Sequence, residues 1–574
     1  MPRVRFFPDN GAVVVRPGLS LLEAARAAGV DLVTPCGGNG VCGKCLLRVL
    51  SGSPDADPAK TATDAPPGPL ALACRHLVGK TDLDLEIPRN AEEIMQIHDQ
   101  GQTVGFDLAP RLAKRFQTAP GRTEVLAGGR HLCFEEGNTS EALFGLAVDI
   151  GTTTLAVSLV DLRTGRETAS AASLNTQSRR AQDVLGRVSF AAEPGGLAAL
   201  QKDVLGDLNE LIAEVCRQAG LDRARIYEAV ICGNTCMLHL VAGKDPAALG
   251  RRPFLPDFRG HAYVRAADLG LNLARQGEVY FPPVMSGYIG ADITAGIVAT
   301  GLEQCRRPTL FIDIGTNGEM ALAKEGRLIA ASTAAGPAFE GMNISSGMRA
   351  SAGAIESFQL RKDGKICWKT IGGLPPRGVC GSGLIDAVAE LAVNGLLAPS
   401  GRFSADGGAF GHALERVEGK SRFQLAPGVF LTQKDIRQVQ LAKAAIRAGI
   451  DILLAQAGFL PAEVERVLVA GSFGYHLRER SLLNLGLLPA AFAGKTEFVG
   501  NTSKAGARIF LLDAARRAAS ASLAEGMRCL ELAELPEFQD IFTSSMSFPA
   551  RDEPPPENHP RKGAPVAEQA AGEP

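Results

Sequence analysis

The sequence predicts a multidomain protein in which a small α+β unit precedes a larger α/β part. The chain has 574 residues, whereas single hydrophobic cores stop growing at roughly 250–300 residues. Near the N-terminus, two short strands around a turn precede a helix and further strands. From residue 145 onward, apolar strand-like segments alternate with helical ones and run into glycine-rich turns. Such alternation is typical of mixed α/β domains.

Changes in pattern along the chain set the expected domain boundaries. The connecting segment lacks long periodic elements, and the C-terminal tail is rich in Pro, Glu, Ala and Gly, a composition that does not support a packed core. We therefore expect a β-grasp domain at 1–88, a linker or small middle segment at 89–144, a two-lobed domain at 145–547 and a disordered tail at 548–574.

Composition excludes two broad classes of partner. The formal net charge is −2, so the protein lacks the strong positive field with which nucleic-acid binders neutralise phosphates. The first residues show no basic start followed by an apolar run, as a secretory signal would. The most apolar long stretch, 442–460, contains Lys443, Arg447 and Asp451. We expect a cytoplasmic protein that binds neither nucleic acid nor membrane.

The N-terminal unit has the pattern of a β-grasp domain. A turn at Asp9, Asn10 and Gly11 separates two short strands. Ser20, with Glu23 three residues later, has the spacing of a capping box and predicts a helix from Ser20 through about Ala28. A strand then follows a cysteine-bearing loop, and an alternating strand lies near 81–87.

Four cysteines in this unit predict an iron–sulfur centre. Their spacing is C-x5-C-x2-C-x28-C, and three of them share one glycine-rich loop: Cys36, Cys42, Cys45 and Cys74. Thiolates suit zinc and iron–sulfur clusters. A zinc ribbon uses two separated C-x2-C pairs, whereas one loop plus a distant fourth cysteine is close to the plant-type ferredoxin pattern. The unit resembles [2Fe–2S] ferredoxins, which implies one such cluster, with zinc as the alternative.

Two segments of the larger part have the same sequence pattern. The stretches 146–162 and 310–323 each run from an apolar strand through Asp-Ile-Gly-Thr into a turn and a second strand. Backbone amides and hydroxyls in such turns can hold phosphate. Two copies predict two related lobes, with Asp149 and Asp313 facing each other across a cleft. Carboxylates placed in this way can hold Mg²⁺ directly or through water.

Two further glycine turns extend the resemblance. The segment 377–391 opens a helix with Gly-Ser-Gly, and 464–474 runs from a strand into another glycine turn. The four motifs, in this order, resemble those of the actin/Hsp70/sugar-kinase (ASKHA) superfamily, whose domains are two-lobed and ribonuclease H-like. That resemblance implies ATP and Mg²⁺, with Asp149 and Asp313 as catalytic residues, and leaves open which of them orients the attacking water. It implies a nucleotide site formed by Gly151, Thr152, Thr153, Thr154, Gly315, Thr316, Asn317, Gly318, Gly381, Ser382, Gly383, Gly471, Ser472 and Gly474.

Other segments resemble one family in particular, the reductive activators of corrinoid enzymes: 175–188, 231–243, 286–297, 336–355 and 433–450. The resemblance implies ATP-dependent reduction of Co(II) to Co(I) in a corrinoid protein of a methyltransferase system, with electrons passing from a low-potential donor through the cluster. The resemblance does not decide whether the protein forms a homodimer. Within these segments, Asp183 and Arg187 have the spacing of a solvated ion pair.

The alternatives have distinguishing signatures. The same fold hosts small-molecule kinases, so one alternative function is a kinase that carries a redox-sensing ferredoxin domain. A second alternative is a nucleotide-gated electron-transfer or binding protein for another enzyme. Some activators carry a C-terminal [4Fe–4S] motif, but Cys529 is the only late cysteine here. The segment 88–144 is also short for the separate middle domain of some family members. We expect Cys232, Cys236 and His239 to be packing residues.

Overall fold

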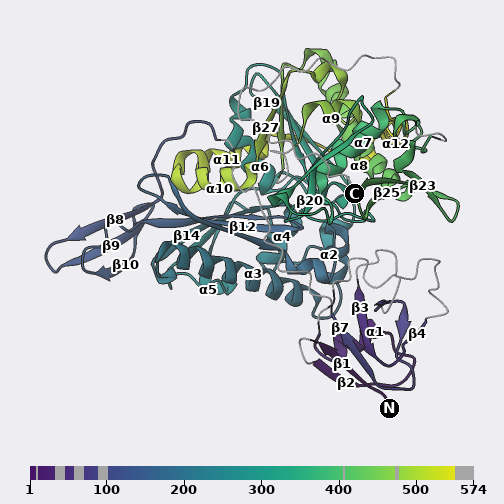
Figure 1. The fold of residues 1–574 in the computed structure, drawn as a ribbon. Helices are drawn as coiled ribbons and strands as arrows, with labels where there is room; N and C mark the ends of the chain where they lie inside the picture. The colour runs from purple at the N-terminus through teal and green to yellow at the C-terminus, as the bar shows by residue number, and fades with distance from the viewer. Residues whose placement is uncertain are drawn as a thin grey trace.

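The computed structural model describes residues 1–7, 11–30, 32, 45–56, 70–87, 101, 103–404, 408–471 and 477–549. Figure 1 shows a small N-terminal domain, drawn in purple, beside a much larger part. Among the described residues, no helix combines the length and apolarity that crossing a bilayer requires.

The N-terminal domain is a β-grasp unit, as the sequence predicted. Its sheet has the order β2-β1-β7-β3-β5, in which β1 pairs antiparallel with β2 and parallel with β7. A capping box between Ser20 and Glu23 starts the helix α1 and confirms the predicted cap. The elements are β1 (Arg3–Phe7), β2 (Gly11–Val14), α1 (Leu21–Ala27), β3 (Leu46–Ser51), β4 (Asp55–Ala56), β5 (Leu70–Leu72), β6 (His76–Leu77) and β7 (Leu83–Glu86). Its own core includes Val4, Phe6, Leu47 and Leu85.

The connecting segment carries a three-stranded sheet with the order β10-β9-β8: β8 (Leu112–Gln117), β9 (Arg122–Ala127) and β10 (Arg130–Glu136). The chain before it is fastened to the larger part, since Val104 N donates to Ala299 O at 2.9 Å and Ala109 N donates to Leu512 O at 2.8 Å. Leu112 packs in a core shared with the first lobe. The described residues of this segment therefore belong structurally to the larger part.

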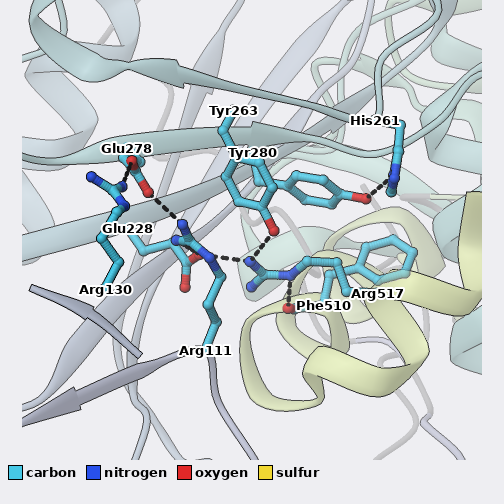
Figure 2. Close-up of polar contacts among 9 residues, drawn as sticks. All are labelled: Arg111, Arg130, Glu228, His261, Tyr263, Glu278, Tyr280, Phe510 and Arg517. Carbon is cyan, nitrogen blue, oxygen red and sulfur yellow. Dashed lines mark hydrogen bonds and ion pairs between the residues drawn. The ribbon is translucent and has the colours of Figure 1, made fainter. Parts of the chain in front are cut away.

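A buried charge network joins this sheet to the first lobe and to helix α11 (Ala514–Gly526) (Figure 2). Glu228 is fully buried and accepts from Arg517 Nη1 at 2.6 Å and from Arg111 Nη1 at 3.3 Å. Arg111 Nη2 also donates to Glu278 at 2.7 Å. Because breaking a buried pair leaves an uncompensated charge, this network fixes the three elements together.

The first lobe is a six-stranded sheet with the order β13-β12-β11-β14-β16-β15. Helix α3 packs on β12 and β13, while α6 and the later helix α10 pack on β14. The elements are β11 (Phe144–Ile150), β12 (Thr154–Asp161), β13 (Glu167–Leu174), α2 (Val184–Ala191), α3 (Gly196–Ala219), β14 (Ile226–Gly233), α4 (Thr235–Val241), β15 (Ala262–Arg265), α5 (Ala266–Leu269), β16 (Glu278–Phe281) and α6 (Ala291–Thr300).

The second lobe repeats the first. Its sheet has the order β27-β26-β17-β18-β19-β28, and in both lobes an antiparallel three-strand meander is extended by a parallel strand beside its first strand. The main elements are β17 (Thr309–Ile314), β18 (Gly318–Lys324), β19 (Arg327–Thr333), α7 (Gly381–Val393), α8 (Gln433–Ala457), β26 (Arg466–Ala470), α9 (Glu479–Asn484), β27 (Thr496–Gly500), α10 (Thr502–Leu512), β28 (Arg528–Leu530) and α12 (Phe538–Ser544). The prediction of two related lobes is confirmed.

Two small sheets complete the second lobe: β20 (Ala354–Leu360), β21 (Ile366–Thr370) and β22 (Gly378–Val379) in one, β23 (Leu414–Val417), β24 (Lys420–Ala426) and β25 (Val429–Thr432) in the other. Helix α10 follows a strand of the second lobe but packs against β11 and β14 of the first. The residues at its start therefore lie where the two lobes meet.

Candidate functional site

A cavity of about 180 Å³ lies between the lobes, at the ends of β11 and β17. Most of the nucleotide residues predicted from the sequence line it, and they come from both repeats and from two glycine turns. They are Asp149, Gly151, Thr152, Thr153, Thr154, Asp313, Gly315, Thr316, Asn317, Gly381 and Gly471. The cavity therefore combines residues from both lobes, as the duplicated motif predicted.

The two turns are related but differ in length, because the first closes between residues three apart and the second between residues two apart. Gly151 N donates to Thr154 O at 2.8 Å, and Gly315 N donates to Asn317 O at 2.9 Å. A Cβ atom at Gly151 would lie 2.8 Å from Thr154 O, so this tight turn has no room for a side chain there. Turns of this kind direct backbone amides toward one side and form concave sites for anions.

Asp149 is held by the start of α10. It accepts a hydrogen bond from Asn501 Nδ2 at 2.8 Å and another from Ser503 Oγ at 2.7 Å. Asn501 also caps α10 by accepting from Lys504 N at 2.9 Å. Burial raises the pKa of Asp149, while these two hydrogen bonds and the charge of Lys504 oppose the rise.

Three further carboxyl groups line the same cavity and have few compensating donors. Burial, together with the charge of Asp149, raises the pKa of Asp292 to about 7. Burial and the charges of Asp292 and Asp149 raise the pKa of Asp313 to about 8. The pKa of Glu319 is raised well above its ordinary value by burial and by the charges of Asp292 and Asp313. Clustered carboxyls that cannot all ionise are the groups that a cation stabilises most.

Glu340 connects the two repeats directly. One carboxylate oxygen accepts from the Thr153 hydroxyl of the first lobe, and the other accepts from the Thr316 hydroxyl of the second. Both threonines lie in turns predicted to hold phosphate. The carboxylate thus takes hydrogen bonds that oxygens of a bound phosphate group could also take.

Some predicted nucleotide residues do not line the cavity. A Cβ atom at Gly318 would lie 2.8 Å from the Ile446 side chain, so this glycine allows close packing against α8. Ser382 Oγ donates to Glu356 O at 2.9 Å, and a Cβ atom at Gly383 would lie 2.1 Å from Ile355 O. These two residues hold the start of α7 against β20. Ser472 and Gly474 lie outside the described residues.

Several cavity residues were not assigned from the sequence: Asn234, Asp292, Glu319, Phe339, Glu340, Arg349, Ala350, Asn501 and Ser503. Most lie within or beside segments that resemble known motifs, but the motifs did not indicate a role for these individual side chains. Asn501 and Ser503 follow β27, about 350 residues from Asp149, and belong to none of those motifs. No local pattern indicated that they would contact Asp149.

Two of the four predicted cluster ligands are described, and they lie together. The Sγ atoms of Cys45 and Cys74 are 3.2 Å apart, and both residues are buried. That separation is well beyond the roughly 2.05 Å of a disulfide bond, and two adjacent thiols suit a shared metal centre. The donor set therefore fits a cluster as far as it is described. Cys36 and Cys42 lie outside the described residues.

The other predictions for buried polar residues had mixed outcomes. Cys232, Cys236 and His239 pack in the first lobe, as expected. His239 Nε2 accepts from Phe258 N, and its other ring nitrogen contacts Thr235 O. Asp183 and Arg187 do not form the expected surface pair, because Asp183 caps α2 through Gly186 N and Arg187 is fully buried.

Three family models match the chain. The 2Fe-2S iron-sulfur cluster binding domain matches residues 7–79, the RACo middle region matches 144–305, and the C-terminal domain of RACo, the ASKHA domain, matches 307–559. The middle region of these proteins therefore corresponds to the first lobe. This differs from the sequence interpretation, which compared the middle domain with the segment 88–144.

Individual relatives agree with these models. The chain is 34% identical over 444 residues to the corrinoid activation enzyme RamQ of Eubacterium limosum, covering 74% of each protein. It is 28% identical over 410 residues to the [Co(II) methylated amine-specific corrinoid protein] reductase of Methanosarcina barkeri, covering 65% of this chain and 71% of the relative. A solved structure described as a reductive activator for corrinoid, iron-sulfur protein matches with a TM-score of 0.72 and 32% identity, over 96% of this chain and 99% of that one.

Proposed function

Because the chain belongs to the family of reductive activators of corrinoid proteins, we propose that it reactivates a corrinoid protein of a methyltransferase system. The reaction is a one-electron reduction of Co(II) to Co(I), coupled to binding and hydrolysis of ATP in the cleft between the lobes. The observation that carries the proposal is the union, in one chain, of a ferredoxin-type domain with paired phosphate turns that line a single cavity.

The nucleotide is proposed to lie with its phosphates between the two turns. Thr152, Thr153 and Thr316 line that cavity, and their amides and hydroxyls would bind the phosphates. Mg²⁺ commonly binds one or two carboxylates and completes its shell with water and phosphate oxygens. Asp313 and Asp292 suit this role, because burial and the neighbouring carboxylates raise their pKa values to about 8 and about 7, and a cation would offset both effects.

Asp149 suits a different task. Its two donors, Asn501 Nδ2 and Ser503 Oγ, fix its orientation and favour its ionised form. Phosphoryl transfer depends mainly on positioning and charge neutralisation, so a fixed carboxylate that orients the attacking water is valuable. We therefore assign water orientation to Asp149 and metal holding to Asp313 with Asp292.

The N-terminal domain is proposed to supply the electron. Cys36, Cys42, Cys45 and Cys74 would hold one [2Fe–2S] cluster, which supplies one-electron transfer at a potential of roughly −400 mV by comparison with plant-type ferredoxins. A reduced low-potential donor is required as the electron source. The chain's own contribution is to bury Cys45 and Cys74 beside the sheet and so limit the access of water to their sulfur atoms.

ATP offers a way to drive an unfavourable electron transfer. A one-electron step that is ~0.1 V uphill costs about 2.3 kcal/mol. A nucleotide can shift such an equilibrium only if it binds two states of the protein with different affinity. Closure of the two lobes around ATP provides two such states, and the Co(II) partner would have to prefer one of them.

The test is formation of Co(I) under anaerobic conditions. The purified protein, with its cluster reconstituted, is mixed with a chemical reductant and a Co(II) corrinoid protein from the same organism, and the Co(I) absorption band is followed with and without Mg-ATP. ATP-dependent Co(I) formation that is lost in both Cys74→Ser and Asp313→Ala supports the proposal. ATP turnover without Co(I), despite an intact cluster, would contradict it and favour the kinase or the nucleotide-gated alternative.

A further inference from the structure

Arg187 is a buried cation that the predicted nucleotide chemistry does not use. It lies on α2, its side chain is fully buried, and it is among the largest buried side chains of the protein. Among the described residues no ion pair joins it to a carboxylate. Burial lowers the pKa of Arg187 to about 10, so it keeps its charge at neutral pH.

Within the described part of the chain, all of its hydrogen-bond acceptors are neutral. Nε donates to Ala181 O at 3.1 Å, Nη1 donates to Gln177 Oε1 at 2.9 Å, and Nη1 also lies 2.9 Å from Met237 Sδ. Nη2 donates to the carbonyl oxygen of Thr152. The carboxylates of Asp183 and Glu340 favour its charge only through space, without a hydrogen bond to the guanidinium, and a buried charge without a directly bonded counter-charge is costly. By contrast, Arg517 in the same part of the protein pairs with Glu228 at 2.6 Å.

The contact with Thr152 places this charge behind the first phosphate turn. Thr152 is held from two sides, because its Oγ1 also accepts from Asn234 Nδ2 at 3.0 Å. In a trans peptide unit the C=O and the following N–H point in opposite directions. Drawing the Thr152 carbonyl toward Arg187 therefore turns the N–H of Thr153 away from Arg187, and Thr153 lines the cavity.

We propose that Arg187 is a positioning residue for nucleotide phosphates: it holds the first turn in its anion-binding conformation and supplies a buried positive charge that a bound phosphate group compensates. The inference rests on the proposed nucleotide site and extends it to a residue that does not touch the ligand. It explains why a guanidinium whose hydrogen-bond acceptors are all neutral is kept beneath this turn, since the phosphate adds negative charge to that of the nearby carboxylates.

The test separates the phosphate end of the nucleotide from its base. Affinities of the full-length, cluster-loaded protein are measured for Mg-ATP, for Mg-pyrophosphate and for adenosine. Arg187→Met should weaken Mg-ATP and Mg-pyrophosphate by roughly 10–100-fold and leave adenosine within about twofold. Arg187→Lys, which keeps the charge but not the planar fork, should recover part of the phosphate affinity.

A matched control removes another buried basic side chain, one whose pKa burial lowers to about 7. Lys443 on α8 also donates to a neutral acceptor, the carbonyl oxygen of Ser547, and does not line the cavity. Lys443→Met should leave the three affinities unchanged. Equal losses for adenosine and pyrophosphate in Arg187→Met, or no loss for either, would overturn the inference. If Arg187→Met does not fold, Arg187→Lys decides: unchanged phosphate affinity overturns the inference. A wild-type protein that binds no Mg-ATP would instead refute the proposed function.

Discussion

The two strand–turn repeats share the sequence Asp-Ile-Gly-Thr, but their turns differ by one residue in length and their aspartates have different surroundings. Asp149 accepts hydrogen bonds from Asn501 and Ser503. Asp313 has no side-chain hydrogen bond within the described residues, and burial beside Asp292 and Asp149 raises its pKa to about 8. A duplicated motif thus places two carboxyl groups in one cavity, whereas distant segments of the chain decide how each of them ionises.

The largest expected effect comes from removing either charge. Asp313→Asn and Asp149→Asn should each lower ATP hydrolysis by roughly 10²–10⁴-fold, because one loses a metal-holding group and the other loses the group that orients water. The two should differ in metal dependence. Raising the Mg²⁺ concentration should partly restore Asp313→Asn and should not restore Asp149→Asn. Steady-state kinetics over a range of Mg²⁺ concentrations test this, and identical responses would contradict the division of roles.

The second prediction concerns stability without nucleotide or metal. An acid whose pKa is raised by folding binds its proton more tightly in the folded state, so its contribution to stability is lost as pH rises toward the folded value. Between about pH 5 and pH 8, the wild-type protein should therefore lose stability through Asp313, by up to about 1.4 kcal/mol per pH unit. Asp313→Asn lacks this loss, so its melting temperature should exceed that of the wild type by a few degrees at pH 8.

The comparison between the repeats makes this measurement specific. At pH 5 the two proteins should melt at similar temperatures, and the difference should grow with pH. Asp149→Asn should show a smaller difference, because the donors Asn501 and Ser503 already offset part of the burial cost in the wild type. Scanning calorimetry at several pH values, in the presence of a chelator, gives the result. A constant difference at all pH values would show that Asp313 is ionised throughout.

A smaller effect is expected from one of the donors. Ser503→Ala removes one of the two hydrogen bonds to Asp149, at a cost of about 1 kcal/mol. This should reduce ATP turnover about fivefold without changing the cluster absorption. Ser520→Ala is the control, since Ser520 Oγ donates to Arg517 O in α11 and does not line the cavity. If Ser503→Ala keeps full turnover, the hydrogen bonds to Asp149 do not set its role.

The repeats also show what the sequence could and could not reveal. The strand–turn motifs identified Asp149 and Asp313, because a strand running into a glycine turn is a local pattern. The capping box at Ser20 was predictable for the same reason. Asp292, Glu319 and Glu340 also line the cavity. No local sequence pattern around them indicates what each of these side chains does.

Packing explains the remaining differences. The Gly-Ser-Gly turn at 381–383 has the sequence of a phosphate turn, but in the structure Ser382 and Gly383 make close contacts with β20 and only Gly381 lines the cavity. Asp183 and Arg187 have the spacing of a surface pair, but α2 turns Arg187 into the core. In both cases tertiary contacts, which no local spacing encodes, decided which side chains are buried in close packing.

The smallest expected effect tests the link between the repeats. Glu340 accepts from Thr153 of one turn and Thr316 of the other, so its carboxylate joins the lobes and would compete with a phosphate of the proposed nucleotide for the same hydroxyls. Glu340→Gln keeps one acceptor oxygen and removes a negative charge near the phosphates, so Mg-ATP affinity should rise about threefold. Glu356→Gln is the control, because Glu356 pairs with Lys369 outside the cavity. Titration calorimetry measures the Mg-ATP affinity of both variants. Weaker Mg-ATP binding in Glu340→Gln would mean that this carboxylate helps to bind the metal ion and does not act mainly by linking the two turns in the absence of nucleotide.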